Sequence, residues 1–387
     1  MGKKVGIEVS IAAAEAVGLC DVDVVAAYPI TPQTHIVEHL SELVANGHLD
    51  AEFVPVESEH SAMSVCCGSV AAGARTFTST SAQGLALMAE IVYIASAMRL
   101  PMLMLVANRA LSAPLSIWND HSDAMMVRDS GWIQIFCENG QDVYDHIFHA
   151  YRVAEDPRVS LPVMVNMDGF ILTHVIEPIE FWTKEMVSSY LPQFRPLHTL
   201  HPDKVVTMGA FGMPEIYAEQ KMAHDQALKN SIPVLQEGWN ELTKVTGRKY
   251  APVEQYRTDG AETLLLCMGS LCETTSLAVD QMRDAGRKVG LVKLRLWRPF
   301  PLAEVRKALA GAKDVVVLDR SITVGGANAP VTSEIRAAMY HEPQRPKIHC
   351  MVAGIGGRDV TPEDITNMVD LSLKGTNQEY YIYGVRG

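Results

Sequence analysis

Short apolar runs alternate with helix-like segments along the first part of the chain, and this alternation limits the folds open to it. Runs of strand length occur at 22–27, 101–107 and 161–167. Between them lie longer segments with apolar residues at helical spacing. Because the strands of a parallel sheet are buried on both faces, they are apolar throughout. The pattern therefore predicts a parallel sheet covered by helices on both faces.

Polar side chains follow three of these strand-like runs at the point where each run ends. They are Thr31 after 22–27, Glu59 after 52–56 and Arg109 after 101–107. In open parallel sheets, ligands bind beyond the carboxyl ends of the strands. If these runs are neighbouring strands, a hydroxyl, a carboxyl group and a guanidinium share one crevice. We therefore take this edge of the sheet as the candidate site.

The bulk properties indicate a soluble protein with more than one domain. The chain has 387 residues, which exceeds the usual size of a single core. Its formal net charge of -12 argues against a nucleic-acid partner, which would require clustered Lys and Arg. The apolar stretch 85–107 is interrupted by Glu90, Arg99 and Pro101, so we expect a buried helix and a strand there. No membrane partner is expected.

Cysteine usage points to a reducing compartment and to no metal site on this chain. The seven cysteines are scattered, odd in number and contain no C-x-x-C pair. Most lie in apolar runs, where a free cysteine behaves as a small hydrophobic residue. The basic amino terminus is followed by Glu8 and Glu15, which disfavour a secretory signal. A cytoplasmic location fits best.

Three segments organise the chain. Residues 1–180 are expected to form the larger parallel-sheet domain, and 181–258 a proline-punctuated helical connector. Residues 259–387 are expected to form a smaller α/β layer with strands at 263–268, 289–294 and 314–319. In the first domain, a helix is expected over 5–19.

Each candidate site residue also has a plain structural interpretation. Glu59 is an acid in the first turn of an expected helix, where the helix dipole favours negative charge. Thr31 is expected to act as an N-cap, with Pro32 in the first turn of the next helix. Arg109 suits bidentate binding of a carboxylate, but a structural ion pair to Asp120, Asp123 or Asp129 is an equal alternative. Position alone does not choose between these interpretations.

Several motifs in order resemble one family. They are A-Y-P-I-T-P-Q-T at 27–34, V-E-S-E-H-S-A at 56–62, Q-G-L-A-L-M at 83–88, N-R-A-L-S-A-P at 108–114, I-W-N-D-H-S-D at 117–123 and M-D-G-F-I-L-T-H at 167–174. Together they resemble the α subunit of thiamine-diphosphate-dependent 2-oxoacid:acceptor oxidoreductases, the pyruvate:ferredoxin oxidoreductase group. The resemblance covers the whole chain. It implies a pyrimidine-type, thiamine-diphosphate-binding parallel-sheet domain followed by a smaller transketolase C-terminal-like α/β domain.

The resemblance also implies an activity and a set of partners. The family oxidatively decarboxylates a 2-oxoacid, coenzyme A takes the acyl group, and electrons leave through iron–sulfur clusters. The α chain supplies the pyrimidine side of the cofactor, whereas a separate β chain holds the diphosphate and its Mg²⁺. Iron–sulfur clusters are expected only on other subunits, of γ and δ type, which pass electrons to ferredoxin or to an NAD-linked subunit. This chain has no GDG-type motif of its own and should be inactive alone.

Residue roles carry over by position. Glu59 matches the acid that bonds to N1′ of the aminopyrimidine and favours its 4′-imino form, which removes the proton from C2. Thr31 and Arg109 match contacts to the substrate carboxylate, and Arg109 would help to position the 2-oxoacid. The loop 108–123 is expected to line the pocket without a catalytic role.

Substrate identity is the least determined part of the resemblance. Thr31 stands where the oxalate-using branch is expected to carry a second arginine, which argues against a dicarboxylate. Pyruvate is the default, while an aryl 2-oxoacid such as phenylglyoxylate, or a branched-chain one, stays open. Two rival functions also stay open. One is a non-catalytic scaffold subunit, and the other is a self-contained NAD-type oxidoreductase, which the missing G-x-G-x-x-G spacing disfavours.

Overall fold

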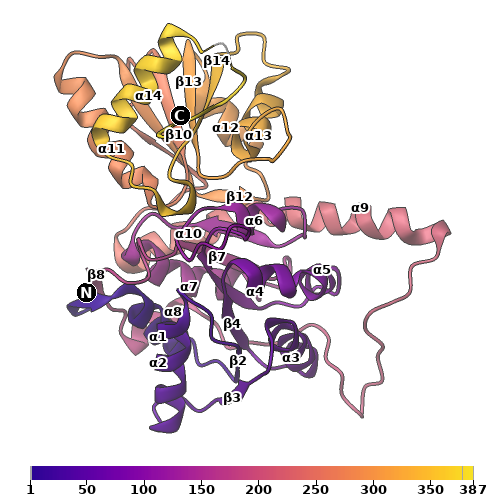
Figure 1. Ribbon diagram of the computed structural model, residues 1–387. Coiled ribbons are helices and arrows are strands. Elements are labelled where there is room, and N and C mark those ends of the chain that lie inside the picture. Colours follow the sequence, from indigo (N-terminus) through magenta and orange to yellow (C-terminus); the bar gives the residue numbers. More distant parts are fainter. Residues whose placement is uncertain (1, 377, 387) are drawn as a thin grey trace.

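Two α/β layers and a projecting arm make up the molecule. The computed structural model describes residues 2–376 and 378–386. The amino-terminal layer and the carboxyl-terminal layer are stacked, and a long helix and an extended segment project to one side (Figure 1). Among the described residues, no helix is both long enough and apolar enough to cross a membrane.

The larger layer is a seven-stranded sheet in the order β12-β6-β7-β5-β4-β2-β3. Its parallel strands are β2 (Val24–Ala27), β3 (Glu52–Pro55), β4 (Thr76–Thr80), β5 (Leu103–Asn108), β6 (Ile133–Phe136) and β7 (Val163–Asp168). The edge strand β12 (Leu296–Arg298) pairs antiparallel with β6. The predicted parallel sheet is therefore present.

Helices cover both faces of this sheet, as the alternation predicts. One face carries α1 (Val9–Leu19), α2 (Thr34–Ala45) and α7 (Gly140–Ala154), and the other carries α3 (Glu59–Ala72), α4 (Ala82–Leu87) and α5 (Ala89–Ala97). Strand β5 shows the division, because Leu103 and Leu105 pack in the first core whereas Met104 and Val106 pack in the second. Burial on both faces explains the continuous apolar run from Leu103 to Ala107.

The smaller layer is a six-stranded sheet in the order β15-β14-β13-β10-β11-β9. Its strands are β9 (Val253–Tyr256), β10 (Thr263–Cys267), β11 (Val289–Leu294), β13 (Asp314–Asp319), β14 (Lys347–Val352) and β15 (Tyr381–Ile382). Its helices are α11 (Leu271–Asp284), α12 (Leu302–Leu309), α13 (Pro330–Met339), α14 (Pro362–Lys374) and the 3₁₀ turn η1 (Ile355–Gly357). All pairs are parallel except β9 with β11.

The amino terminus differs from the sequence prediction. The expected helix over 5–19 begins only at Val9, because residues Lys4–Glu8 form strand β1. This strand pairs antiparallel with β8 (Ile176–Glu180) in a separate two-stranded sheet. Its partner lies about 170 residues away in the chain, so local periodicity gives no sign of the pairing.

Two strands cross the expected boundaries between segments. Strand β9 lies in the segment 181–258 yet joins the smaller sheet, and β12 lies in the segment 259–387 yet extends the larger one. The same middle segment holds α8 (Lys184–Tyr190), α9 (Pro214–Asn230) and α10 (Ile232–Thr246). The division of the chain at 180 and 258 remains a prediction.

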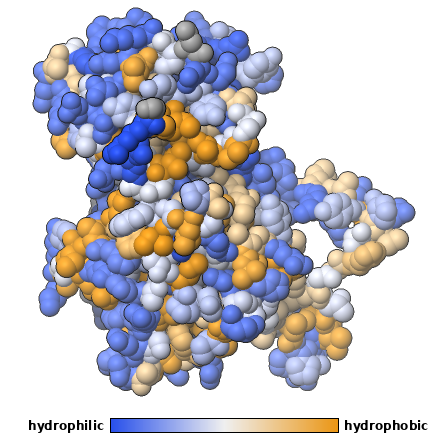
Figure 2. All heavy atoms as spheres, in the orientation of Figure 1, coloured by the Kyte–Doolittle hydropathy of each residue, from blue (hydrophilic) through white to orange (hydrophobic). Residues whose placement is uncertain are grey.

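The arm consists of the segment 194–213 and helix α9. Of the residues of α9, only Ala227 is buried. Apolar side chains on the arm are exposed to solvent: Val205, Phe211, Met213, Tyr217 and Met222. Figure 2 shows hydrophobic and hydrophilic residues mixed along this arm, which stands away from the body of the molecule.

Candidate functional site

The three strand ends singled out in the sequence lie at one edge of the larger sheet. Strands β5, β4, β2 and β3 are consecutive in the sheet and all parallel, so Arg109 (after β5), Thr31 (after β2) and Glu59 (after β3) lie at the same edge. Arg109 and Thr31 are in direct contact, since Nη1 of Arg109 donates to the carbonyl oxygen of Thr31 at 2.8 Å. The predicted shared edge is therefore present.

Arg109 is held by backbone carbonyls. Its side chain is buried, Nε donates to the carbonyl oxygen of Ser116 at 3.0 Å, and Nη1 binds Thr31. Within the described part of the chain, the guanidinium forms no ion pair and Nη2 has no hydrogen-bond partner. Burial lowers the pKa of Arg109, and the carboxylate of Asp123 opposes this effect. The guanidinium is thus fixed in place with one nitrogen free to bind an anion.

Glu59 is the first residue of α3. The hydroxyl of Ser58 caps this helix by accepting from the backbone N–H of Ser61 at 3.3 Å. Glu59 is only 6% exposed, yet its carboxyl group has no hydrogen-bond partner among the described residues. Neither carboxyl oxygen is among the fully buried polar atoms that lack a partner, so the carboxyl group reaches solvent at this edge of the sheet. This group is placed to bind something outside the chain.

Gly84 in helix α4 leaves the space that Glu59 occupies. A Cβ atom at position 84 would lie 2.6 Å from Oε1 of Glu59 and 2.5 Å from Oγ1 of Thr80. Both distances are well below ordinary contact, so only glycine permits this approach. The motif at 83–88 and the acid at 59 therefore meet at one point of this edge of the sheet.

Thr31 does not cap the next helix, contrary to the prediction. Helix α2 starts at Thr34, and the cap residue is Gln33, which makes no side-chain cap bond. A proline disfavours helical backbone in the residue before it, so Pro32 keeps Thr31 outside the helix. Gln33 is instead fully buried, with Nε2 donating to the carbonyl oxygen of Tyr28 at 2.9 Å. The hydroxyl of the exposed Thr31 is thereby left for another role.

The loop after Arg109 is bonded to the smaller layer at Asn119. Trp118 accepts a backbone bond from Ala110 at 3.0 Å, and Asn119 accepts one from Gly357 at 2.6 Å. Gly357 has a φ of 75° and belongs to the turn η1 of the smaller layer. The smaller layer therefore supports the loop whose Ser116 carbonyl holds Arg109.

A buried ionic cluster joins the two layers beside this loop. Asp168, at the end of β7, accepts from Nε2 of His121 at 2.8 Å and from Nη1 of Arg320 at 2.7 Å. The backbone N–H of Ser270 also donates to Asp168 at 2.9 Å. Sequence reasoning did not single out Asp168, although it too is a polar residue at the end of an apolar run.

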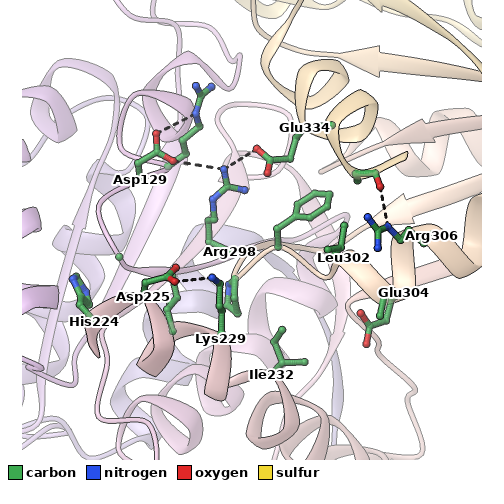
Figure 3. A pocket seen from close by; sticks show the side chains of 18 of the residues that line it. Asp129, His224, Asp225, Lys229, Ile232, Arg298, Leu302, Glu304, Arg306 and Glu334 are labelled. Atoms are coloured by element: carbon green, nitrogen blue, oxygen red, sulfur yellow. Dashed lines mark hydrogen bonds and ion pairs between the residues drawn. The ribbon is translucent and has the colours of Figure 1, made fainter. Parts of the chain in front are cut away.

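A hollow of about 930 Å³ lies elsewhere, between α9, α10, α12 and α13. Its charged side chains pair with one another, since Arg298 binds Glu334 at 3.0 Å and Lys229 binds Asp225 at 2.6 Å (Figure 3). None of Thr31, Glu59 or Arg109 lines it. Because none of the three residues singled out in the sequence lines this hollow, we place the candidate site at the strand ends instead.

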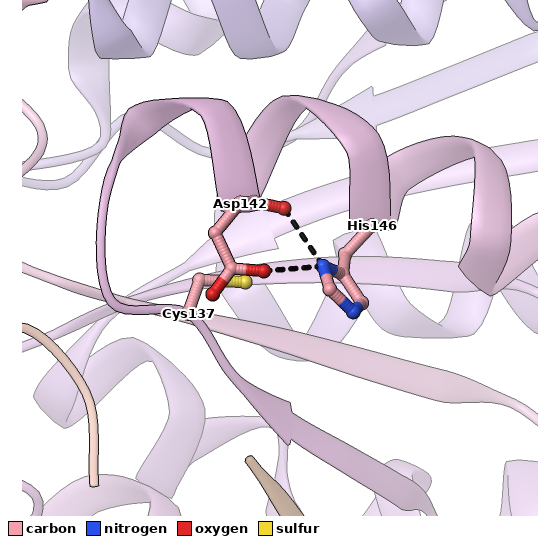
Figure 4. Close-up of side chains that lie close together, drawn as sticks. All are labelled: Cys137, Asp142 and His146. Atoms are coloured by element: carbon pink, nitrogen blue, oxygen red, sulfur yellow. Dashed lines mark hydrogen bonds and ion pairs between the residues drawn. The ribbon is translucent and has the colours of Figure 1, made fainter. Parts of the chain in front are cut away.

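Three buried side chains, Cys137, Asp142 and His146, lie together as metal ligands can, with their ligand atoms within 4.8 Å of one another (Figure 4). Their polar atoms are already used. Asp142 binds Nδ1 of His146 at 2.6 Å and Nη2 of Arg295 at 3.1 Å. Nε2 of His146 accepts from the indole of Trp239 at 2.9 Å. The cluster is a structural hydrogen-bond network.

Comparison with known families assigns both layers. The family described as pyruvate flavodoxin/ferredoxin oxidoreductase, thiamine diphosphate-binding, matches residues 15–237. The family described as pyruvate:ferredoxin oxidoreductase core domain II matches residues 261–365.

Curated relatives match over nearly the whole chain. The chain is 47% identical over 362 residues to pyruvate synthase subunit PorA of Methanocaldococcus jannaschii, covering 93% of this chain and 92% of that protein. It is 42% identical over 351 residues to ketoisovalerate oxidoreductase subunit VorA of Pyrococcus furiosus, covering 90% and 88%.

Solved structures share the fold. The 2-oxoglutarate:ferredoxin oxidoreductase from Magnetococcus marinus superposes with a TM-score of 0.72 at 20% identity. The match covers 95% of this chain and 65% of that longer chain. A split-gene transketolase superposes with a TM-score of 0.57 at 13% identity, covering 96% and 99%. The predicted fold class, a thiamine-diphosphate-binding parallel-sheet domain with a smaller transketolase C-terminal-like layer, is confirmed.

Proposed function

Because the chain belongs to the pyruvate flavodoxin/ferredoxin oxidoreductase family, we propose that it is the α subunit of a pyruvate-oxidising complex. In the proposed reaction, pyruvate and coenzyme A give acetyl-coenzyme A, CO₂, a proton and two electrons. The electrons pass to ferredoxin or NAD through iron–sulfur clusters on other subunits. The observation that carries the proposal is the 47% identity to a pyruvate synthase subunit across 93% of the chain.

The residues at the strand ends fit the pyrimidine side of thiamine diphosphate. Glu59 offers a nearly buried carboxyl group without an internal partner, and Gly84 keeps the neighbouring backbone free of a side chain. When bound, thiamine diphosphate supplies a carbon nucleophile for attack on a 2-oxo group. Its diphosphate and Mg²⁺ are assigned to a β-type subunit. The complex is placed in the cytoplasm, which the free state of all seven cysteines supports.

Each of the three site residues, Glu59, Arg109 and Thr31, has one role in the proposed function. Glu59 holds a proton at N1′ of the aminopyrimidine, as a positioned carboxyl group does in general acid–base catalysis. Arg109 binds the substrate carboxylate through the free Nη2, since Nε and Nη1 are already bonded to backbone carbonyls. Arg109 binds the backbone carbonyl of Thr31, so the two residues are neighbours, and the hydroxyl of Thr31 is assigned to the same carboxylate. Together they orient the 2-oxo carbon for reaction.

A branched-chain 2-oxoacid is the second candidate substrate. The observation that favours it is the relative named ketoisovalerate oxidoreductase subunit VorA, at 42% identity. The relative named for pyruvate is five percentage points more similar, which supports pyruvate as the main proposal. Both substrates carry the carboxylate that Arg109 and Thr31 are proposed to bind.

The proposal is tested on the native complex purified with its partner subunits under anaerobic conditions. We expect one tightly bound thiamine diphosphate per αβ pair, and dye reduction that requires both pyruvate and coenzyme A. A panel with 2-oxoisovalerate, phenylglyoxylate and 2-oxoglutarate compares kcat/KM, and pyruvate is expected to give the highest value. A complex that contains no thiamine diphosphate would contradict the assignment, and a higher kcat/KM for 2-oxoisovalerate would transfer it to the second candidate.

Gly84→Ala tests the contact with Glu59. The added Cβ would lie 2.6 Å from Oε1 of Glu59, so the carboxyl group must move away from its position. A displacement of about 1 Å at a reacting group lowers rates on the order of 10²-fold. We expect a loss of that size in kcat/KM together with weaker retention of thiamine diphosphate on gel filtration. Gly6→Ala is the control, because its Cβ would meet only Ile176 at 3.9 Å.

A further inference from the structure

Asp123 is a fully buried carboxylate that accepts four hydrogen bonds. Its Oδ1 accepts from Nδ2 of Asn108 at 3.0 Å and from the backbone N–H of Ala124 at 2.7 Å. Its Oδ2 accepts from the backbone N–H of Ala82 at 3.0 Å and from that of Arg109 at 2.9 Å. None of these donors carries a charge, and three of the four are backbone N–H groups. Asp123 therefore acts mainly as a hydrogen-bond acceptor for the backbone.

The two donors to Oδ2 belong to two adjacent strand ends of the candidate site. Ala82 follows β4 and opens the helix that carries Gly84, which contacts Glu59. Arg109 follows β5, the next strand of the sheet. One carboxylate oxygen of Asp123 therefore holds the segment facing the proposed cofactor side and the segment facing the proposed substrate side.

The backbone at the start of α4 is strained and is stabilised by a side chain from another part of the chain. Ala82 has a φ of 39°, a region that residues with a Cβ adopt seldom and at a cost. The hydrogen bond from its N–H to Asp123 stabilises this conformation. The hydroxyl of Ser81 and Nη1 of Arg109 both donate to the carbonyl oxygen of Thr31, at 3.0 Å and 2.8 Å. The segment after β4 and the segment after β5 thus share two hydrogen-bond acceptors, the carbonyl oxygen of Thr31 and Oδ2 of Asp123.

Only an ionised carboxylate satisfies all four donors. Each carboxylate oxygen accepts two hydrogen bonds, whereas an amide in the same place would direct its NH₂ toward two N–H donors. Burial raises the pKa of Asp123 to about 6, although Asn108 and the backbone N–H groups of Arg109 and Ala82 act in the opposite direction.

We propose that Asp123 is a positioning residue, which sets the placement of Arg109 relative to the Glu59-facing segment without touching the substrate itself. The proposal rests on the function proposed above, in which Arg109 binds the substrate carboxylate. It predicts that a change at Asp123 acts on catalysis through Arg109. A merely structural role would lower stability and leave the kinetic constants of the assembled complex unchanged.

The test compares the purified complex carrying Asp123→Asn, Arg109→Lys or both changes. We expect Asp123→Asn to raise the KM for pyruvate and to lower kcat/KM about tenfold or more, because small misplacements of binding groups have effects of that order. The thiamine diphosphate content should match the wild type. Because Asp123 acts through Arg109, the double variant should be no worse than Arg109→Lys alone within about twofold. Effects that multiply in the double variant would overturn the proposal.

Two further variants complete the design. Asp120→Asn is the matched control, since Asp120 is buried in the same loop but binds Ser122 and the backbone N–H of Gly356 and not the ends of β4 or β5. Asp123→Glu keeps the negative charge but displaces the carboxylate by one methylene group. If the Asn variant does not assemble, the KM of Asp123→Glu for pyruvate is measured in its place. An unchanged KM in Asp123→Glu and Asp123→Asn would overturn the proposal. A wild-type complex without pyruvate- and coenzyme-A-dependent activity would instead contradict the proposed function.

Discussion

Glu59→Gln in the assembled complex is expected to lower kcat for pyruvate oxidation about 10²- to 10⁴-fold, the usual contribution of a positioned acid or base. The amide keeps the size of the side chain and its place at the first position of α3. It cannot hold an exchangeable proton at N1′ of the aminopyrimidine in the way that a carboxyl group can. The loss therefore falls on the chemical step.

The kinetic constants separate this role from substrate binding. With thiamine diphosphate saturating, the KM for pyruvate should change little in Glu59→Gln, because the substrate carboxylate is assigned to Arg109 and Thr31. A variant that loses an interaction made only in the transition state lowers kcat and kcat/KM equally. Stopped-flow reduction of the clusters under single-turnover conditions measures the chemical step directly.

Glu52→Gln is the matched control for this experiment. Glu52 is an exposed acid at the amino end of β3, the opposite end of the strand that leads to Glu59. It should leave kcat within about twofold, as a surface change remote from the site does. A Glu59→Gln complex with wild-type kcat would show that the chain is a non-catalytic scaffold, which is the rival function drawn from the sequence.

Much of the fold could be predicted because buried parallel strands leave a strong local signal. The apolar runs ending at Ala27 and Ala107 are strands β2 and β5 of the structure. The candidate edge could be predicted for the same reason, since the polar residue after each run must lie where the strand ends. Thr31 and Arg109 therefore lie at this edge, where Arg109 binds the carbonyl oxygen of Thr31, and their roles in substrate binding stay predictions.

Short and partly polar strands could not be predicted in the same way. Strand β12 has three residues and joins a sheet formed by the other half of the chain. Strand β1 is partly exposed and is followed directly by α1. Its sequence therefore has the appearance of the first turn of that helix. Pairing of this kind depends on tertiary contacts that override local preference.

The supporting residues of the site were missed because their partners are distant in sequence. Asp123 binds the N–H of Ala82 across 41 positions, and Asp168 binds Arg320 across 152. Sequence reasoning weighed Asp123 only as an ion-pair partner for the Arg109 guanidinium, whereas the structure places it on the Arg109 backbone. A strand-end rule applied to every apolar run would also have marked Asp168, at the end of β7.

Asp168→Asn is expected to lower the stability of the chain by about 3–5 kcal/mol, the usual cost of removing one partner from a buried ion pair. Asp168 is 1% exposed, and the change leaves the guanidinium of Arg320 buried without its carboxylate. Because these groups come from different layers, the loss should appear as earlier separation of the smaller layer. Hydrogen exchange should show faster opening at β10 and β13, and calorimetry a Tm lowered by about 5 °C.

The same cluster predicts how stability depends on pH. Burial acts to raise the pKa of Asp168, but the charges of His121 and Arg320 outweigh it and hold this pKa well below its usual range. A carboxyl group whose folded pKa is depressed stabilises the fold above its unfolded pKa, about 3.9, and loses that contribution as the pH falls below it.

The stability difference between wild type and Asp168→Asn should therefore be constant above about pH 5 and shrink below about pH 4. The control is Asp280→Asn, which breaks an exposed pair with Arg257 and should cost at most about 1 kcal/mol. If the Tm difference for Asp168→Asn stays the same from pH 7 to pH 3, the ion pairs do not hold the two layers together. A difference that shrinks between pH 4 and pH 3 shows that the ionised carboxylate of Asp168 contributes to the junction between the layers, which the loop of His121 links to the Arg109 side of the site.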